Sequence, residues 1–230
     1  MRISAGTSGF SYKEWRGSFY PEGMKEADML QYYAARFDTV ELNNTFYRLP
    51  NEAALQSWAA QVPPGFRFSL KASRTITHIR RLKVEAAEAV EYLFRVTSVL
   101  GDARGPVLFG LPPNMKCDVE RLTSFLSLVP PGARSAFEFR HESWLCDEVY
   151  DLLRSRGCAL CIADTAEHTT PLVATTDWGY VRLRREEYTD ADLAGWHQRI
   201  AGQQWSDAFV YFKHEDAGTG PRLARDFLAL

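Results

Sequence analysis

The sequence lacks both an apolar stretch of membrane length and a strong net charge. No apolar run approaches the roughly 20 residues that a helix needs to cross a bilayer. Residues 1–6 enter a strand-like run directly, without the apolar region of a signal peptide. The formal net charge is -2, so no overall field draws the chain to nucleic acid or to an anionic membrane. These features predict a cytoplasmic protein with no membrane partner.

Cysteine is also scarce, and the common nucleophile and metal motifs are missing. The chain has 4 cysteines in 230 residues, too few for a disulfide scaffold. Cys158 and Cys161 have the spacing of a redox or metal pair, but their strand-like run would send the two thiols to opposite faces. No HxH, HExxH or serine-centred nucleophile elbow appears. We therefore expect structural cysteines, and the sequence assigns no metal ligand and no cofactor.

Short apolar runs alternate with longer helical patterns along the whole chain. Strands are predicted at residues 2–6, 39–42, 67–71, 106–110, 135–138, 158–163, 180–183 and 208–212. Helices are predicted at residues 28–37, 52–61, 85–100, 118–128, 147–156, 189–201 and 222–229, with Asp28 and Asp118 as caps. Helical crossovers indicate a parallel sheet, and eight strands can close a barrel that side chains fill. The predicted fold class is α/β, a single (β/α)8 TIM-like barrel in one domain, residues 1–230.

An open, doubly wound sheet is the competing architecture. It predicts a glycine-rich phosphate turn between the first strand and a helix. Gly6-Thr7-Ser8-Gly9 is instead followed by aromatic residues and Pro21, without the start of a helix. The dinucleotide-binding fingerprint is therefore not met.

Charged residues stand at the carboxyl ends of the strand-like runs, where α/β barrels keep their active sites. Alternate residues of a strand point to opposite faces, and we take the more apolar face of each strand as the one that packs on helices. The inward residues near the mouth are then the acids Glu41, Glu138 and Asp164 and the bases Lys71, Arg140, Arg182 and Lys213. The surplus of bases predicts a small anionic ligand, phosphorylated or carboxylated. The alternative is a set of ion pairs that plugs the barrel top without function.

Each candidate residue has a role in this hypothesis. Lys71, Arg140, Arg182 and Lys213 would hold the anion, with Asp164 beside them. Glu41 and Glu138 are the acid/base candidates, and His141 is a second proton-transfer candidate. Asn43, Asn44 and Tyr47 would orient the ligand. Whether the protein is an enzyme, as a hydrolase or isomerase, stays open at this point.

Three other functions compete with the anion pocket. A metal-dependent phosphoesterase, similar to an endonuclease, could use Glu41, Glu138, His141 and Asp164 with His78 and His214, although nearby bases would repel a divalent ion. A glycoside hydrolase needs two facing carboxyls, which Glu41 and Glu138 could supply, with Trp15, Trp144 and Trp178 stacking on a sugar. A non-catalytic nucleic-acid-binding module could use the aromatic first loop with Arg16, Arg48, Arg74, Arg80 and Arg81.

The chain resembles the domain-of-unknown-function 72 family at nine segments. They are residues 6–12 (Gly-Thr-Ser-Gly-Phe-Ser-Tyr) with Trp15, 19–21, 40–48 (Val-Glu-Leu-Asn-Asn-Thr-Phe-Tyr-Arg), 66–72, 76–78, 111–113, 137–141 with Trp144, 180–183 and 211–214. The resemblance implies a (β/α) barrel, similar in shape to the xylose isomerase and endonuclease IV types, and no established reaction. Two positions depart from the family pattern. Gly110 stands where members often carry Gln, and Arg184-Arg185 stands where many carry His-Gly.

Overall fold

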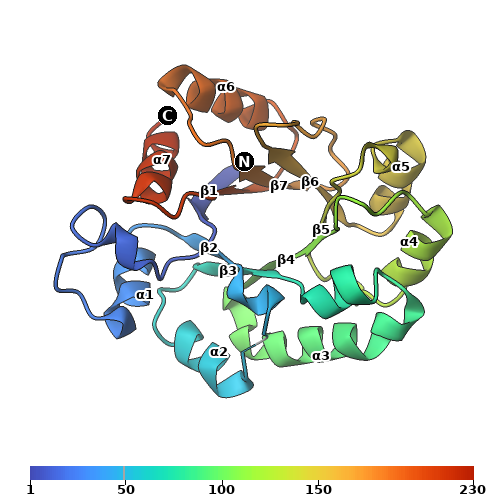
Figure 1. The fold of residues 1–230 in the computed structure, drawn as a ribbon, viewed down its shortest axis with the longest axis horizontal. Helices are drawn as coiled ribbons and strands as arrows, with labels where there is room; N and C mark the ends of the chain where they lie inside the picture. Colours follow the sequence, from blue (N-terminus) through green and yellow to red (C-terminus); the bar gives the residue numbers. More distant parts are fainter. Residues whose placement is uncertain (49) are drawn as a thin grey trace.

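All eight predicted strands form, and they build one parallel sheet that curls into a nearly closed barrel (Figure 1). The structure is a computed structural model that describes residues 1–48 and 50–230. The sheet order is β1-β8-β7-β6-β5-β4-β3-β2. The strands are β1 (Arg2–Thr7), β2 (Thr39–Leu42), β3 (Arg67–Lys71), β4 (Arg104–Gly110), β5 (Ser135–Glu138), β6 (Ala159–Asp164), β7 (Trp178–Leu183) and β8 (Asp207–Phe212). The predicted fold class is confirmed.

Helices form an outer ring around the barrel (Figure 1). They are α1 (Glu26–Ala34), α2 (Glu52–Ala59), α3 (Ala87–Thr97), α4 (Val119–Leu126), α5 (Asp147–Ser155), α6 (Asp190–Ala201) and α7 (Thr219–Leu228). Asp118 caps α4 as predicted, because its carboxylate accepts a hydrogen bond from Arg121 N at 2.9 Å. The predicted Asp28 cap is wrong, since α1 already begins at Glu26. None of the helices that the structure describes is long and apolar enough to cross a membrane.

The loop after β3 contains a π-helical turn, Thr75–Ile79, that the sequence did not predict. It is followed by Arg81 and Leu82 with φ of 50° and 59°, a left-handed conformation that is unfavourable for non-glycine residues. The Leu82 side chain is fully buried, and this apolar burial offsets the backbone strain. Single-turn π-bulges occur often at functional sites. This one places His78 beside the end of β3.

The seam between β1 and β2 closes the barrel by an unusual route. An isolated parallel bridge joins Ser8 to Glu41, and Gly9 N donates to Glu41 O at 2.7 Å. Deeper in the seam, the Tyr33 hydroxyl of α1 accepts a hydrogen bond from Thr7 N at 2.8 Å and donates to Thr39 O at 3.1 Å. A tyrosine hydroxyl thus replaces a direct ladder bond between the two strands.

Side-chain size differs across the barrel interior. Strands β7 and β8 contribute large aromatic residues, whereas β5 and β6 contribute small ones; the interior set is Leu108, Ala136, Ala159, Cys161, Trp178, Tyr180, Phe209 and Tyr211. The tyrosines cross the barrel, because the Tyr211 hydroxyl lies 2.6 Å from both Thr39 Oγ1 and Ser69 Oγ. Large side chains opposite small ones fill the interior, so the barrel has a packed core below its mouth.

Close packing on the outer face of β7 gives a first prediction. A Cβ atom at Gly179 would lie 2.3 Å from carbon atoms of the buried Trp205 ring. We expect Gly179→Ala to lower the free energy of unfolding by about 2 kcal/mol, measured by urea denaturation. Gly195→Ala on α6 is the control, because no atom lies within 4 Å of its added methyl group. That change should be neutral or stabilising by up to about 1 kcal/mol. Equal effects of the two variants would contradict this packing argument.

Candidate functional site

A fully buried arginine and two buried glutamates form the centre of the barrel mouth. Arg182, from β7, is 1 % exposed, while Glu41 of β2 is 0 % exposed and Glu138 of β5 is 1 % exposed. Arg182 Nη2 donates to Glu41 Oε1 at 2.8 Å, and Arg182 Nη1 donates to Glu138 Oε2. Strand parity predicted that these three residues face inward, and the structure confirms it. The two carboxylates are held on one guanidinium.

The remaining contacts of Glu41 come from the barrel wall. Ser8 Oγ donates to Glu41 Oε1 at 2.6 Å, and the Tyr180 hydroxyl donates to Glu41 Oε2 at 2.7 Å. Burial by itself would raise the pKa of Glu41, but Arg182 and these two donors hold it below its usual range. Glu41 is therefore ionised at neutral pH and satisfied by its neighbours.

Glu138 connects the buried centre to the rim. Its Oε1 accepts hydrogen bonds from Arg140 Nε at 3.0 Å and Arg184 Nη1 at 3.2 Å. Burial opposes ionisation, but Arg182, then Arg140 and Arg184, hold the pKa of Glu138 well below its usual range. One carboxylate thus meets three guanidinium groups, which leaves positive charge in excess.

Lys71, at the end of β3, lies in this cationic surrounding without an ion pair among the residues described. Its ammonium lies 4.7 Å from the centre of the Phe46 ring. Burial, and then the charge of Arg182, lowers the pKa of Lys71 to about 8. Lys71 therefore has a much larger neutral fraction near neutral pH than an exposed lysine.

His78 is a mouth residue that the sequence analysis named only as a possible metal ligand. Its ring packs edge-on against Phe46, at 4.9 Å between ring centres, and its Nδ1 lies 2.8 Å from Thr77 Oγ1. Burial, then Arg140 and Lys71, lowers the pKa of His78. The sequence did not predict its position beside Phe46 and Lys71, because that position depends on the π-helical turn.

Asp164 is placed differently from the prediction. It ends β6 on the helix-facing side, where Trp196 Nε1 donates to its carboxylate at 3.1 Å. The Tyr188 hydroxyl and Arg185 Nε also donate to it, at 3.0 and 2.9 Å. The predicted inward orientation is wrong because the polar partners of Asp164 lie outside the barrel, and its contacts serve the packing of α6.

Four other predicted residues lie apart from the buried centre. His141 Nδ1 accepts a hydrogen bond from Ser143 N at 3.2 Å, which gives it a capping contact. Asn43 and Asn44 line a groove of about 640 Å³ that also reaches Trp58 of α2 and Gln61, which follows that helix. Tyr47 is 73 % exposed. None of these contacts tests a role in ligand binding.

Lys213 follows β8 at the rim. Its side chain is 38 % exposed, and its ammonium lies 4.0 Å from Glu215. Burial, then Arg184, lowers the pKa of Lys213. It is thus an accessible cation beside the buried network.

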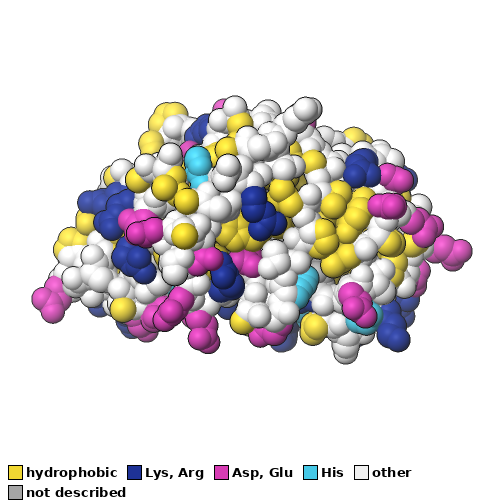
Figure 2. Space-filling model, turned by 90° about the horizontal axis from the view of Figure 1, so that it is seen from above, with side chains coloured by type: hydrophobic (Ala, Val, Ile, Leu, Met, Phe, Trp, Pro, Cys, Tyr) yellow, Lys and Arg dark blue, Asp and Glu magenta, His cyan; other side chains and the backbone are white. Residues whose placement is uncertain are grey.

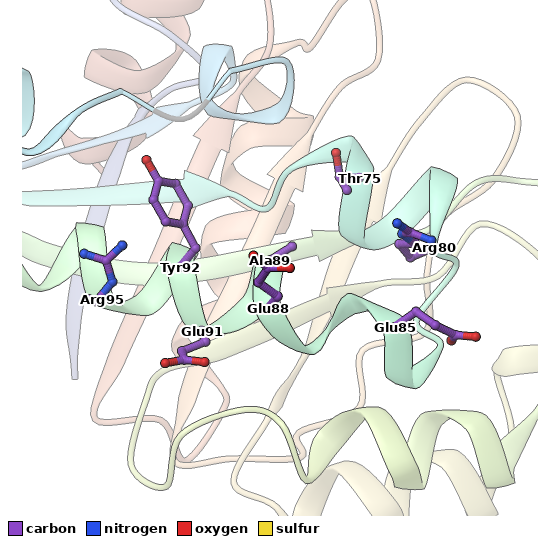
Figure 3. Close-up of a pocket in the computed structure, with 8 residues that line it drawn as sticks. All are labelled: Thr75, Arg80, Glu85, Glu88, Ala89, Glu91, Tyr92 and Arg95. Carbon is purple, nitrogen blue, oxygen red and sulfur yellow. The ribbon is translucent and has the colours of Figure 1, made fainter.

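A second groove lies outside the barrel along α3 and has the opposite character (Figure 3). Its volume is about 410 Å³, and its lining includes Glu85, Glu88, Glu91, Arg80 and Arg95. The carboxylates are in the majority there, so this groove does not suit an anion. The cationic mouth remains the better candidate site.

Comparison with known proteins shows the family. The family model described as "Protein of unknown function DUF72" matches residues 4–230. The chain belongs to the DUF72 family. The resemblance that the sequence motifs indicated is thereby confirmed.

Relatives of this DUF72 protein agree in fold. It is 23% identical over 216 residues to the UPF0759 protein YunF of Bacillus subtilis, covering 86% of this chain and 74% of that one. A DUF72 family crystal structure from Thermotoga maritima is 27% identical, with a TM-score of 0.88 over 100% of this chain and 98% of that one. A xylose isomerase-like TIM barrel/4-hydroxyphenylpyruvate dioxygenase fusion protein is 14% identical, with a TM-score of 0.55 over 99% of this chain and 42% of that protein. This last likeness is one of fold alone.

The mouth contains few of the groups that bind metals. Over residues 1–48 and 50–230, no group of three or more histidine, cysteine, aspartate or glutamate side chains is arranged to hold a metal ion. The carboxylate oxygens of Glu41 and Glu138 already accept hydrogen bonds from arginine, serine and tyrosine donors. The arrangement favours contacts to negative groups.

The buried centre predicts a pH-dependent stability effect. Arg182→Met would leave the buried Glu41 carboxylate without a cation and would remove the buried partner of Glu138, so we expect a loss of about 3–5 kcal/mol at pH 7.5 by urea denaturation. Because both glutamates have depressed pKa values in the folded protein, the stability they contribute is present above the ordinary value of 4.5 and is lost as the pH falls below it. The penalty should therefore shrink in acid.

Neutral partners provide the control for this variant. Adding Glu41→Gln and Glu138→Gln to Arg182→Met removes the unpaired charges and should recover a large part of the lost stability. An Arg182→Met protein as stable as the original at pH 7.5 would contradict the ion-pair argument.

Asp164 should be structural. Asp164→Ala removes hydrogen bonds from Trp196, Tyr188 and Arg185, and we expect a loss of about 3 kcal/mol in unfolding free energy. Phosphate affinity, measured by calorimetry on the folded variant, should stay within about twofold. A large loss of phosphate affinity with an unchanged free energy of unfolding would show instead that Asp164 takes part in binding.

Proposed function

We propose that this protein binds a small phosphorylated or carboxylated molecule at the carboxyl ends of β3, β5, β7 and β8. The observation that carries the proposal is the excess of positive charge at the barrel mouth. Five cations meet three carboxylates there, which leaves two positive charges in surplus; they are Lys71, Arg140, Arg182, Arg184 and Lys213 against Glu41, Glu138 and Glu215. Uncompensated charge in a partly buried place is costly, and a bound anion would neutralise it.

The cations differ in what they can offer to a ligand. Arg182 is committed to the two glutamates, so we assign it to the floor of the site. Arg140 uses only Nε on Glu138, and among the described residues its two terminal nitrogens have no partner. Arg184 has a buried Nε with no acceptor in the same part of the chain. We therefore assign the anion to Arg140 and Arg184, with Lys213 at the rim.

Proton transfer, if the protein is catalytic, suits other residues than the glutamates. Glu41 and Glu138 stay ionised near neutral pH and have little affinity for a proton. Lys71, with a pKa of about 8, can exchange protons near neutral pH, and His78, whose pKa is lowered by burial, can accept a proton in its neutral form. Acid/base action by Glu41, Glu138 or His141 remains a prediction that no contact of the site supports.

The competing functions find less support in the contacts. The aromatic first loop packs as its own small core, with Trp15 fully buried and Tyr20 1 % exposed, so these rings are not free to stack on bases. Trp144 and Trp178 are likewise buried. On the face that Figure 2 shows, acidic and basic side chains are interspersed, whereas a nucleic-acid surface gathers basic ones.

Calorimetric titration with inorganic phosphate and with sulfate tests the proposal. Arg140→Ala and Arg184→Ala each remove a charged donor, so each should weaken binding about 10-fold to 100-fold. Arg154→Ala is the charge-matched control, because Arg154 is exposed and pairs with Asp151 on α5. Absence of binding at millimolar phosphate and sulfate, or equal affinity in all three variants, would overturn the anion site.

A further inference from the structure

We propose that the Lys71 amine forms a covalent imine with the carbonyl group of the bound anion, so that the substrate class is a phosphorylated or carboxylated aldehyde or ketone. This inference rests on the proposed anion site and adds a reacting atom to it. Lysine amines that are desolvated or placed beside other cations are known nucleophiles toward carbonyls. Lys71 meets both conditions.

The placement of Lys71 supports a reactive role more than a structural one. Its side chain comes from the inward face of β3, at the mouth, and is partly exposed. A structural buried lysine is normally paired with a carboxylate, but within the described residues Lys71 Nζ has no such pair. The Phe46 ring, 4.7 Å away, covers one side of the ammonium without supplying an acceptor.

Charged neighbours keep this amine partly neutral. Arg182 and Arg140 destabilise the ammonium, whereas Glu41 and Glu138 stabilise it but are already neutralised by arginines. His78 is the further titratable group beside it. At pH 7.5 a pKa of about 8 leaves about a quarter of Lys71 neutral, against about one in a thousand for a lysine near 10.5. The nucleophilic form is thus present under ordinary conditions.

The end of strand β4 places no side chain beside Lys71. The neighbouring strand β4 ends at Gly110, which has no side chain. A Cβ atom there would lie 3.5 Å from Glu138 Oε2 and 3.8 Å from Lys71 Cε. Because Gly110 has no side chain, the end of β4 places no group between Lys71 and Glu138, and this is the side on which we place the carbonyl of the bound anion.

The chemistry balances without an oxidant or cofactor. The neutral amine attacks the carbonyl carbon, the carbonyl π electrons pass to oxygen, and a proton moves from nitrogen to that oxygen to give a carbinolamine. Loss of this oxygen as water, with a second proton, gives the imine. The ligand and Lys71 together release one water molecule, and hydrolysis reverses the step.

Borohydride trapping of glycolaldehyde phosphate tests the proposal, because reduction fixes an imine as a stable secondary amine. We expect about one adduct per chain, located at Lys71 by peptide mass mapping, with labelling at least tenfold faster than at the exposed Lys116. Its rate should rise with pH through about 8. Lys71→Met should abolish the fast phase and Lys116→Met should not. Labelling spread evenly over the lysines would overturn the imine.

Ethylene glycol monophosphate, which carries the phosphate without a carbonyl, separates the two proposals. If it binds and Arg140→Ala weakens it, while no adduct forms at Lys71, the anion site stands and the imine fails. The proposed function itself fails if ethylene glycol monophosphate does not bind and the labelling rate does not saturate as the glycolaldehyde phosphate concentration rises. Trapping with glyoxylate in parallel distinguishes a carboxylated from a phosphorylated substrate, and fast labelling of Lys71 by either compound supports the inference.

Discussion

The ion pairs of one buried arginine govern the upper half of this barrel. Arg182 cannot remain charged at 1 % exposure without compensation, and Glu41 and Glu138 supply it from strands β2 and β5 on either side. Three strands, none of which is a neighbour of another in the sheet order, are thereby fixed to one guanidinium. The aromatic layer below keeps water out and strengthens these contacts, since electrostatic interactions increase as the surroundings become less polar.

The pairing of Arg182 with the two glutamates determines the charge balance of the layer above it. Glu41 and Glu138 attract other cations less strongly because both already pair with Arg182. Arg140 and Arg184 nevertheless donate hydrogen bonds to Glu138. Lys71 is partly buried among these positive charges, and burial together with the charge of Arg182 lowers its pKa to about 8. The same surplus that makes the mouth attractive to an anion therefore makes one amine nucleophilic. The proposed anion binding and the proposed reactivity of Lys71 would both follow from a single charge arrangement.

Sequence alternation predicted the barrel and its buried centre because the period of two is a local property of each strand. It placed Glu41, Glu138 and Arg182 inward, and the structure agrees. The rule failed at Asp164, where the helix-facing side is itself polar: Trp196 donates a hydrogen bond there, and this partner lies 32 residues away. The position of His78 beside Lys71 could not be predicted for a related reason, since it follows from a π-helical turn and two left-handed residues, which no simple period marks.

Glu41 also links the charge centre to barrel closure. Its carbonyl accepts the Gly9 N–H, and its carboxylate accepts the Ser8 hydroxyl, so both halves of the residue hold β2 against the end of β1. This seam has an isolated bridge in place of a full ladder, with Tyr33 filling the gap below. Glu41 thus contributes both to the charge balance of Arg182 and to the closure of the barrel, so the mouth and the seam share one residue.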